Sequence, residues 1–173
     1  MQIAIYSRTS ADVEVSNLQQ LLDALERSGI TPLVFEPFYA LARPMLKLDR
    51  ELKTFCSAGD LDSDVDFLVS MGGDGTLLDT VCFVRDKGIP VIGINFGRLG
   101  FLAVFGKEDV ESLVEALINR NFQIDQRGLL HLDCNVPLFG EVPYALNEFT
   151  IHKKDTSAMI KIHTFLNGEF LNT

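Results

Sequence analysis

The chain has 173 residues, and 47% of them are hydrophobic, which suits one domain with a packed core or one domain and part of another. A formal net charge of −9 with no basic stripe argues against a nucleic-acid surface. No apolar run approaches transmembrane length, so no membrane span is expected. The three cysteines, Cys56, Cys82 and Cys134, are far apart and form no metal-ligand motif, so a reduced, cytoplasmic protein is the simplest interpretation.

Strand patterns recur through the first two thirds of the chain. The N-terminal run has no basic segment and predicts a first strand rather than a signal peptide. The last of these runs is apolar enough for burial on both faces of a sheet. Four short apolar runs predict strands, at residues 3–6, 31–35, 65–71 and 90–95.

Helical spacing of apolar residues separates these strands. It predicts a helix from Val15 that ends near Gly29, one that follows residue 76 and ends near Gly88, and one at residues 110–118. Residues 41–55 stay ambiguous because Pro44 interrupts a stretch with helical charge spacing. Alternating strands and helices predict an α/β fold, a doubly wound, Rossmann-like parallel sheet domain that spans residues 1–123.

The pattern changes after residue 123. Partial period-2 alternation predicts strands at residues 130–136, 144–152 and 159–167, separated by prolines, glycines and charged residues that suit turns. We therefore expect residues 124–173 to be the incomplete start of an all-β domain. Its unpaired strand edges would favour association, so a homo-oligomer is expected.

The sequence Gly72-Gly73-Asp74-Gly75-Thr76 lies between a predicted strand and a predicted helix. Glycines let the backbone approach a ligand, and N–H groups at a helix start can bind an anion. We expect Gly72, Gly73 and Thr76 to lie against a phosphate, while the carboxylate of Asp74 either binds a metal or accepts a proton from an attacking hydroxyl. The segment indicates phosphoryl transfer, although a simple tight turn remains the alternative. It is neither a P-loop nor the dinucleotide fingerprint.

Two further segments carry weaker signals. Residues 95–102 form a second glycine-punctuated loop, in which Phe101 either stacks on a base or packs in the core. Asn147 and Glu148 interrupt an apolar segment, and they either recognise polar groups of a ligand or are an exposed polar pair. The three histidines are scattered, and ordinary strand positions explain them.

Together the three segments resemble the NAD kinase family. The resemblance lies in residues 72–78, 93–102 and 145–148, in this order and spacing, and it extends over the whole chain. The first segment alone is shared with lipid kinases of the diacylglycerol kinase type and, in a variant form, with phosphofructokinases. The second and third segments make NAD kinase the more specific match.

The resemblance implies transfer of the ATP γ-phosphoryl group to the 2′-hydroxyl of the adenosine ribose of NAD, giving NADP, with Mg²⁺ or another divalent cation. It implies that Asp74 is the general base, that Gly75 lies beside the dinucleotide and that Phe101 lies near the adenine. It also implies that Asn147 and Glu148 bind NAD.

Two departures from the family pattern stand out. A further Gly/Thr/Ser/Tyr-rich motif of the family is missing, and Ala158 stands where many members have a basic or imidazole side chain. We therefore expect an N-terminal fragment of a NAD kinase that has little activity alone. The alternatives are a lipid kinase and a non-catalytic nucleotide-binding or oligomerisation module.

Overall fold

The computed structural model describes the chain except for residues 9–14, 98–99, 137, 140–141 and 155–158. Its centre is a parallel sheet with the strand order β3-β2-β1-β4-β5. The first strand lies in the middle and the chain extends the sheet to both sides, which is the Rossmann order. This confirms the predicted fold class. The strands are β1 Gln2–Tyr6, β2 Thr31–Phe35, β3 Lys53–Phe55, β4 Phe67–Met71 and β5 Val91–Ile94.

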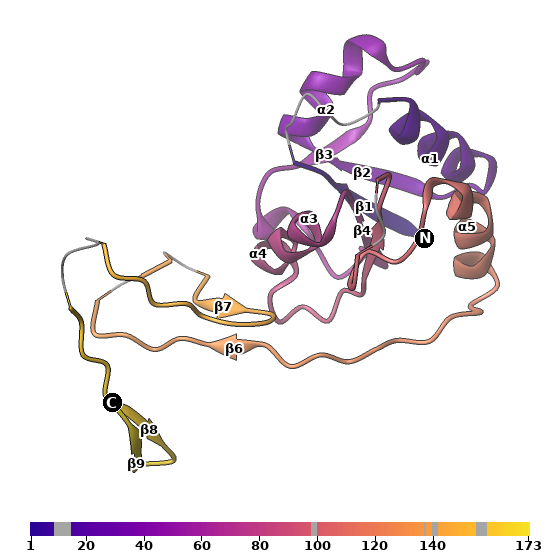
Figure 1. Cartoon of the computed structure of the whole chain (residues 1–173). Coiled ribbons are helices and arrows are strands. Elements are labelled where there is room, and N and C mark those ends of the chain that lie inside the picture. The colour runs from indigo at the N-terminus through magenta and orange to yellow at the C-terminus, as the bar shows by residue number, and fades with distance from the viewer. Residues whose placement is uncertain (9–14, 98–99, 137, 140–141, 155–158) are drawn as a thin grey trace.

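Helices cover both faces of this sheet (Figure 1). Successive residues of β1 alternate between the two faces, as strand geometry requires. Ile3 and Ile5 join a core with α1, α2 and α5, whereas Ala4 and Tyr6 join a second core with α4. The helices are α1 Val15–Arg27, α2 Glu36–Ala42, α3 Asp74–Asp79, α4 Val81–Val84 and α5 Val110–Ile118, with 3-10 turns at Arg43–Met45, Ala58–Asp60 and Lys107–Asp109.

The ambiguous residues 41–55 contain a strand that the hydrophobic pattern did not reveal. After α2 the chain makes the 3-10 turn that includes Pro44, and β3 then pairs with β2 at the edge of the sheet. Lys53 and Thr54 of β3 are exposed. A short, polar strand is typical of a protected sheet edge, and it lacks the apolar alternation that reveals a half-buried strand. The run at residues 65–71 therefore supplies the fourth strand, not the third.

The helix predicted after the glycines is divided in two. Thr80 ends α3 and begins α4, and its hydroxyl donates to the Leu77 carbonyl at 2.6 Å. The second helix ends at Val84, because Arg85 has a φ of 45°. Gly88, with a φ of 69°, completes the connection to β5. The prediction that this helical segment ends near Gly88 is confirmed to within four residues.

The predicted strands after residue 123 are wrong over most of their length. The structure has two small antiparallel pairs, β6 Leu130–His131 with β7 Tyr144–Ala145, and β8 Thr164–Leu166 with β9 Glu169–Asn172. A two-stranded hairpin has no second layer to cover its apolar residues. Accordingly Phe165, Leu166, Phe170 and Leu171 are exposed. A domain boundary near residue 123 stays a prediction.

Among the residues that the structure describes, no helix is both long and apolar enough to cross a membrane.

Candidate functional site

The glycine turn, residues 72–76, connects β4 to α3 at the carboxyl end of the sheet. Gly72 has a φ of 148°, and a Cβ placed there would lie 2.4 Å from Thr76 Oγ1. A side chain at this position would therefore be strained and would clash. The Gly72 N–H donates to the Ile94 carbonyl at 2.8 Å, which ties the turn to the end of β5. The backbone conformation of the turn thus requires glycine and is anchored to the sheet.

The carboxylate of Asp74 accepts hydrogen bonds from three successive backbone N–H groups. Phe101 N donates to Oδ2 at 2.8 Å, and Leu102 N and Ala103 N donate to Oδ1 at 3.0 and 2.9 Å. These donors belong to a turn at residues 100–103, which we call the 100–103 turn. The Gly100 N–H donates to the Ala103 carbonyl at 3.2 Å and closes this turn. A carboxylate offers about four acceptor positions, so the contacts with described residues leave one position, on Oδ2.

These N–H donors favour the ionised carboxylate. The N–H groups of Ala103, Leu102 and Phe101 lower the pKa of Asp74 below its ordinary value. Asp74 is therefore a carboxylate at neutral pH and can accept a hydrogen bond or a proton on Oδ2. The same three N–H groups reduce its basicity and fix the position of the carboxylate.

The lowered pKa makes a prediction for the unliganded chain. Asp74 should titrate below the ordinary Asp value of about 3.9. Ionised Asp74 stabilises the fold above that pH, and this stabilisation is lost as the pH falls through the lowered pKa. A carbon-detected NMR titration of the Asp74 Cγ resonance measures the midpoint. A midpoint at or above the ordinary value would contradict the contact with the 100–103 turn.

The other residues predicted for this turn lie close to Asp74. Gly75 occupies the first turn of α3, and Thr76 is buried. The Thr76 N–H donates to the Gly73 carbonyl at 2.9 Å. The structure therefore brings Gly72, Gly73, Asp74, Gly75 and Thr76 together at one edge of the sheet.

Phe101 lies beside Asp74, but its backbone makes the contact. Its side chain is 95% exposed, so the alternative of a core aromatic is wrong. The ring is accessible to a planar ligand, which leaves the prediction of a base-stacking role untested. Arg98 and Leu99 of the same predicted loop, and Ala158 further along, lie outside the described residues.

Asn147 and Glu148 are exposed and follow β7 outside any strand, Asn147 in a bend. Glu148 lines a hollow of about 500 Å³ whose wall includes Cys82 of α4, together with Phe139, Tyr144 and Phe149. Partial burial of the thiol raises the pKa of Cys82, although the residue as a whole is exposed. Of the described residues that line this hollow, none belongs to the glycine turn. The predicted NAD-binding pair therefore lies on α4's side of the molecule, and its role remains a prediction.

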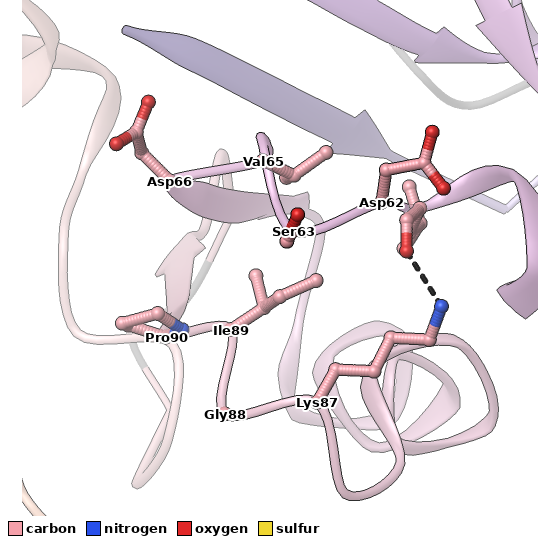
Figure 2. A pocket seen from close by; sticks show the side chains of 9 residues that line it. Asp62, Ser63, Val65, Asp66, Lys87, Gly88, Ile89 and Pro90 are labelled. Carbon is pink, nitrogen blue, oxygen red and sulfur yellow. Dashed lines mark hydrogen bonds between the residues drawn. The ribbon is translucent and has the colours of Figure 1, made fainter.

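A second hollow, of about 490 Å³, lies at the opposite, amino end of β4 and β5 (Figure 2). Asp62, Asp66 and Lys87 contribute to its wall. The Lys87 ammonium donates to the carbonyls of Ala58 and Leu61, both at 2.5 Å. Since backbone carbonyls already hold the lysine and no predicted site residue lines this hollow, it is not part of the candidate site.

The described residues contain no group of three or more His, Cys, Asp or Glu side chains that could hold a metal ion. They therefore do not fit a resident metal cage. Mg²⁺ commonly binds to substrate phosphates with only one or two protein carboxylates. A cation that binds in this way needs no cluster of protein carboxylates.

One charged side chain that the sequence analysis did not single out also reaches the site. The Arg8 Nη2 donates to the Gly75 carbonyl at 2.9 Å. Arg8 follows β1, the strand next to β4. Its position two residues after a central strand is a signal that could have revealed it, because ligands of such sheets bind at the carboxyl ends of the strands.

Comparisons with known proteins identify relatives of this chain. A family described as the ATP-NAD kinase N-terminal domain matches residues 38–122. The NAD kinase of Cytophaga hutchinsonii is 38% identical, and the alignment covers 100% of this chain and 59% of the relative. For the NAD kinase of Flavobacterium johnsoniae the identity is 37%, with 100% and 60% covered. The chain therefore spans about three fifths of the length of these curated relatives.

A solved structure shows the same fold. The yeast NADH kinase, crystallised as a complex with NADH, superposes with a TM-score of 0.79 at 22% identity, over 99% of this chain and 54% of its own. The family match includes the glycine turn and the 100–103 turn, and the curated relatives align with the whole chain. On these grounds the chain belongs to the NAD kinase family.

Proposed function

We propose that this chain carries the phosphoryl-transfer site of a NAD kinase, which moves the ATP γ-phosphoryl group to the 2′-hydroxyl of the NAD adenosine ribose. The observation that carries the proposal is the Asp74 carboxylate, fixed by three N–H donors with one acceptor position left on Oδ2. Family membership supports NAD and ATP as the substrates. The yeast neighbour, an NADH kinase in complex with NADH, supports a dinucleotide ligand for this chain.

In this proposal Asp74 orients the 2′-hydroxyl and accepts its proton. A positioned base is typically worth about 10²–10⁴ in rate. Phosphoryl transfer passes through a loose transition state, so position and charge matter more than the strength of the base. A carboxylate of lowered pKa but fixed geometry suits this requirement.

Substrate binding is proposed for the residues around Asp74. Gly72, Gly73 and Thr76 lie against the phosphates, and Gly75 lies beside the dinucleotide. The exposed ring of Phe101 contacts the adenine, and Asn147 and Glu148 bind NAD. Mg²⁺ or another divalent cation arrives with the phosphates of ATP, since the described residues do not form a metal cage of their own.

The function is tested with a chimera in which residues 1–173 replace the matching segment of the Cytophaga hutchinsonii NAD kinase. The chimera should form NADP from NAD, ATP and Mg²⁺, and it should not phosphorylate diacylglycerol. The 173-residue chain alone should form little or no NADP, because the described residues that line the hollow beside Glu148 include none of the glycine turn. A folded chimera without NADP formation would favour a non-catalytic nucleotide-binding module.

Asn147→Ala should weaken NAD binding by the chimera without affecting its fold. Loss of one ligand hydrogen bond costs on the order of 1–3 kcal/mol, which is about five- to 150-fold in Kd. Asn147 is exposed in the unliganded chain, so its replacement should leave the melting temperature unchanged. Calorimetric titration of NAD measures the effect, and an unchanged Kd would identify Asn147 and Glu148 as an ordinary exposed pair.

Two coarser proposals concern the whole protein. Self-association is supported by the exposed apolar side chains of β8 and β9, which neither hairpin strand can cover. A cytoplasmic location is supported by Cys56, Cys82 and Cys134, which are all exposed and free.

A further inference from the structure

Arg8 lies at the point of the sheet where ligands of doubly wound folds bind. From β1 the chain continues to β2 on one side, and β4 continues to β5 on the other. The connections after β1 and β4 therefore run to opposite sides of the sheet. In folds of this kind, ligands commonly bind in the crevice between two such connections, at the carboxyl ends of the strands. Arg8 extends from the end of β1 and the glycine turn from the end of β4, so the two border this crevice from adjacent strands.

The backbone next to Arg8 is fixed by a buried hydrogen bond. The hydroxyl of Ser7 donates to the Met71 carbonyl at 2.9 Å. This bond joins the last residue of β4 to the residue that precedes Arg8. Arg8 therefore starts from a rigid position beside the glycine turn.

The guanidinium of Arg8 is also held in place. Its Nε donates to Asp79 Oδ2 at 2.5 Å, and its Nη2 donates to Asp79 Oδ1 at 2.8 Å and to the Gly75 carbonyl at 2.9 Å. The Tyr6 hydroxyl donates to the same Asp79 carboxylate at 3.2 Å. Asp79 belongs to α3, the helix that the glycine turn begins. The guanidinium is thus fixed relative to that turn before any ligand binds.

These bonds leave part of the guanidinium available. Arginine has five N–H donors, of which one on Nε and two on Nη2 are used within the described residues, so the two on Nη1 remain. Nη1 lies 3.3 Å from the place where a Cβ of residue 75 would be. Because residue 75 is glycine, no side chain covers Nη1 on that side.

Stability alone does not account for this arrangement. The side chains of Arg8 and Asp79 are 55% and 33% exposed, and an ion pair of this exposure contributes little to folding. A planar guanidinium with a free edge, held rigidly in a chain of net charge −9, is well suited to bind phosphate oxygens.

We propose that Arg8 is a phosphate-binding residue of this site and that Asp79 is the positioning residue that holds it beside Gly75. The ligand is the phosphoryl oxygens of a nucleotide bound across the ends of β1 and β4. The inference rests on the proposed function for the identity of that nucleotide. The phosphates belong either to the ATP triphosphate or to the NAD pyrophosphate.

Calorimetric titrations of the 173-residue chain with MgATP, with inorganic tripolyphosphate and with NAD test the inference. Arg8→Ala should weaken binding of the ligand that Arg8 contacts by about tenfold or more. Loss of affinity for MgATP and tripolyphosphate identifies the donor phosphates, and loss for NAD alone identifies the pyrophosphate. Arg8→Lys should restore only part of the affinity, because an ammonium cannot hold Asp79 and a phosphate with the same planar geometry.

Arg27→Ala is the matched control. The Arg27 side chain is 62% exposed and pairs with Glu111. Arg27 is the last residue of α1, shortly before β2 begins, so it lies at the amino ends of the strands, opposite the candidate site. Its loss removes the same charge and a comparable ion pair, and it should change each Kd by less than twofold. If Arg8→Ala does not fold, the Arg8→Lys titrations provide the same test.

Asp79→Asn tests the positioning role. The Arg8 Nε–H resonance should be sharp and slowly exchanging in the native chain and should be lost in this variant, together with part of the phosphate affinity. A change in stability alone would leave the affinity unaltered. Unchanged affinity with a lost resonance would therefore show that Asp79 does not position Arg8 for binding.

Three results would overturn the assignment of Arg8. In the first, Arg8→Ala binds every probe with a Kd within twofold of the native value. In the second, Arg27→Ala loses as much affinity as Arg8→Ala. In the third, the native chain binds none of the probes. NADP formation by the chimera together with binding independent of Arg8 would overturn this inference alone. Binding that depends on Arg8 without NADP formation would contradict only the proposed function.

Discussion

Replacement of Asp74 by Asn should reduce the rate of NADP formation by the chimera at least about a hundredfold. The substitution preserves the size of the side chain but replaces one acceptor oxygen with a donor N–H₂ group. All three contacts of the 100–103 turn need acceptors, so the amide cannot satisfy them and also accept a hydrogen bond from the substrate hydroxyl. Both the proton acceptor and its orientation are therefore lost.

The measurement is kcat for NADP formation at saturating NAD and MgATP. The circular dichroism spectrum should change little, and the melting temperature should fall only by the contribution of the bonds to the 100–103 turn, because Asp74 lies at the edge of the sheet and not in its core. If the Asn variant keeps more than about a tenth of the kcat, Asp74 is not the general base, since such a loss is smaller than a positioned base contributes.

Sequence patterns identified the central strands and the glycine turn because both are encoded by residue type. Buried parallel strands need continuous apolar runs. The turn needs glycine at position 72, where a Cβ would clash with Thr76. Such features are visible in the amino-acid sequence because burial restricts the strands to apolar residues and the backbone of the turn requires glycine at position 72.

The contacts around Asp74 and Arg8 could not be predicted in the same way. Backbone N–H groups hold the Asp74 carboxylate, and nearly every residue has one, so no residue type marks their position. Phe101 attracted attention through its ring, whereas the structure uses its N–H. Arg8 and Asp79 are 71 positions apart in the sequence and meet only because β1 and β4 are neighbours.

The polar edge strand β3 was not predicted, and the C-terminal strands were predicted to be longer than they are. Both errors have a related reason. Alternation of apolar residues predicts a strand only where one face is buried. β3 has exposed polar residues although it belongs to the main sheet. Residues 159–167 have apolar alternation, but in the structure only residues 164–166 of that stretch form a strand, and its side chains are exposed.

Gly100→Ala should reduce the kcat of the chimera about a hundredfold while it lowers stability only slightly. A Cβ at residue 100 would lie 2.1 Å from Asp74 Oδ1 and 2.5 Å from Asp74 Cγ, so the carboxylate must move. A displacement of about 1 Å at a reacting group can cost on the order of 10² in rate. The contact is with a side chain at the edge of the sheet, so the core of the fold is unaffected.

Gly97→Ala is the matched control for this variant. A Cβ at residue 97 would lie 3.7 Å from Asn95 Oδ1, an ordinary van der Waals distance, so its kcat should stay close to that of the unmodified chimera. In Gly100→Ala the displaced carboxylate loses N–H donors, so the pKa of Asp74 should rise toward its ordinary value, and NMR titration of both variants detects this shift. An unchanged kcat and an unchanged Asp74 pKa in Gly100→Ala would show that the 100–103 turn does not position the carboxylate for catalysis.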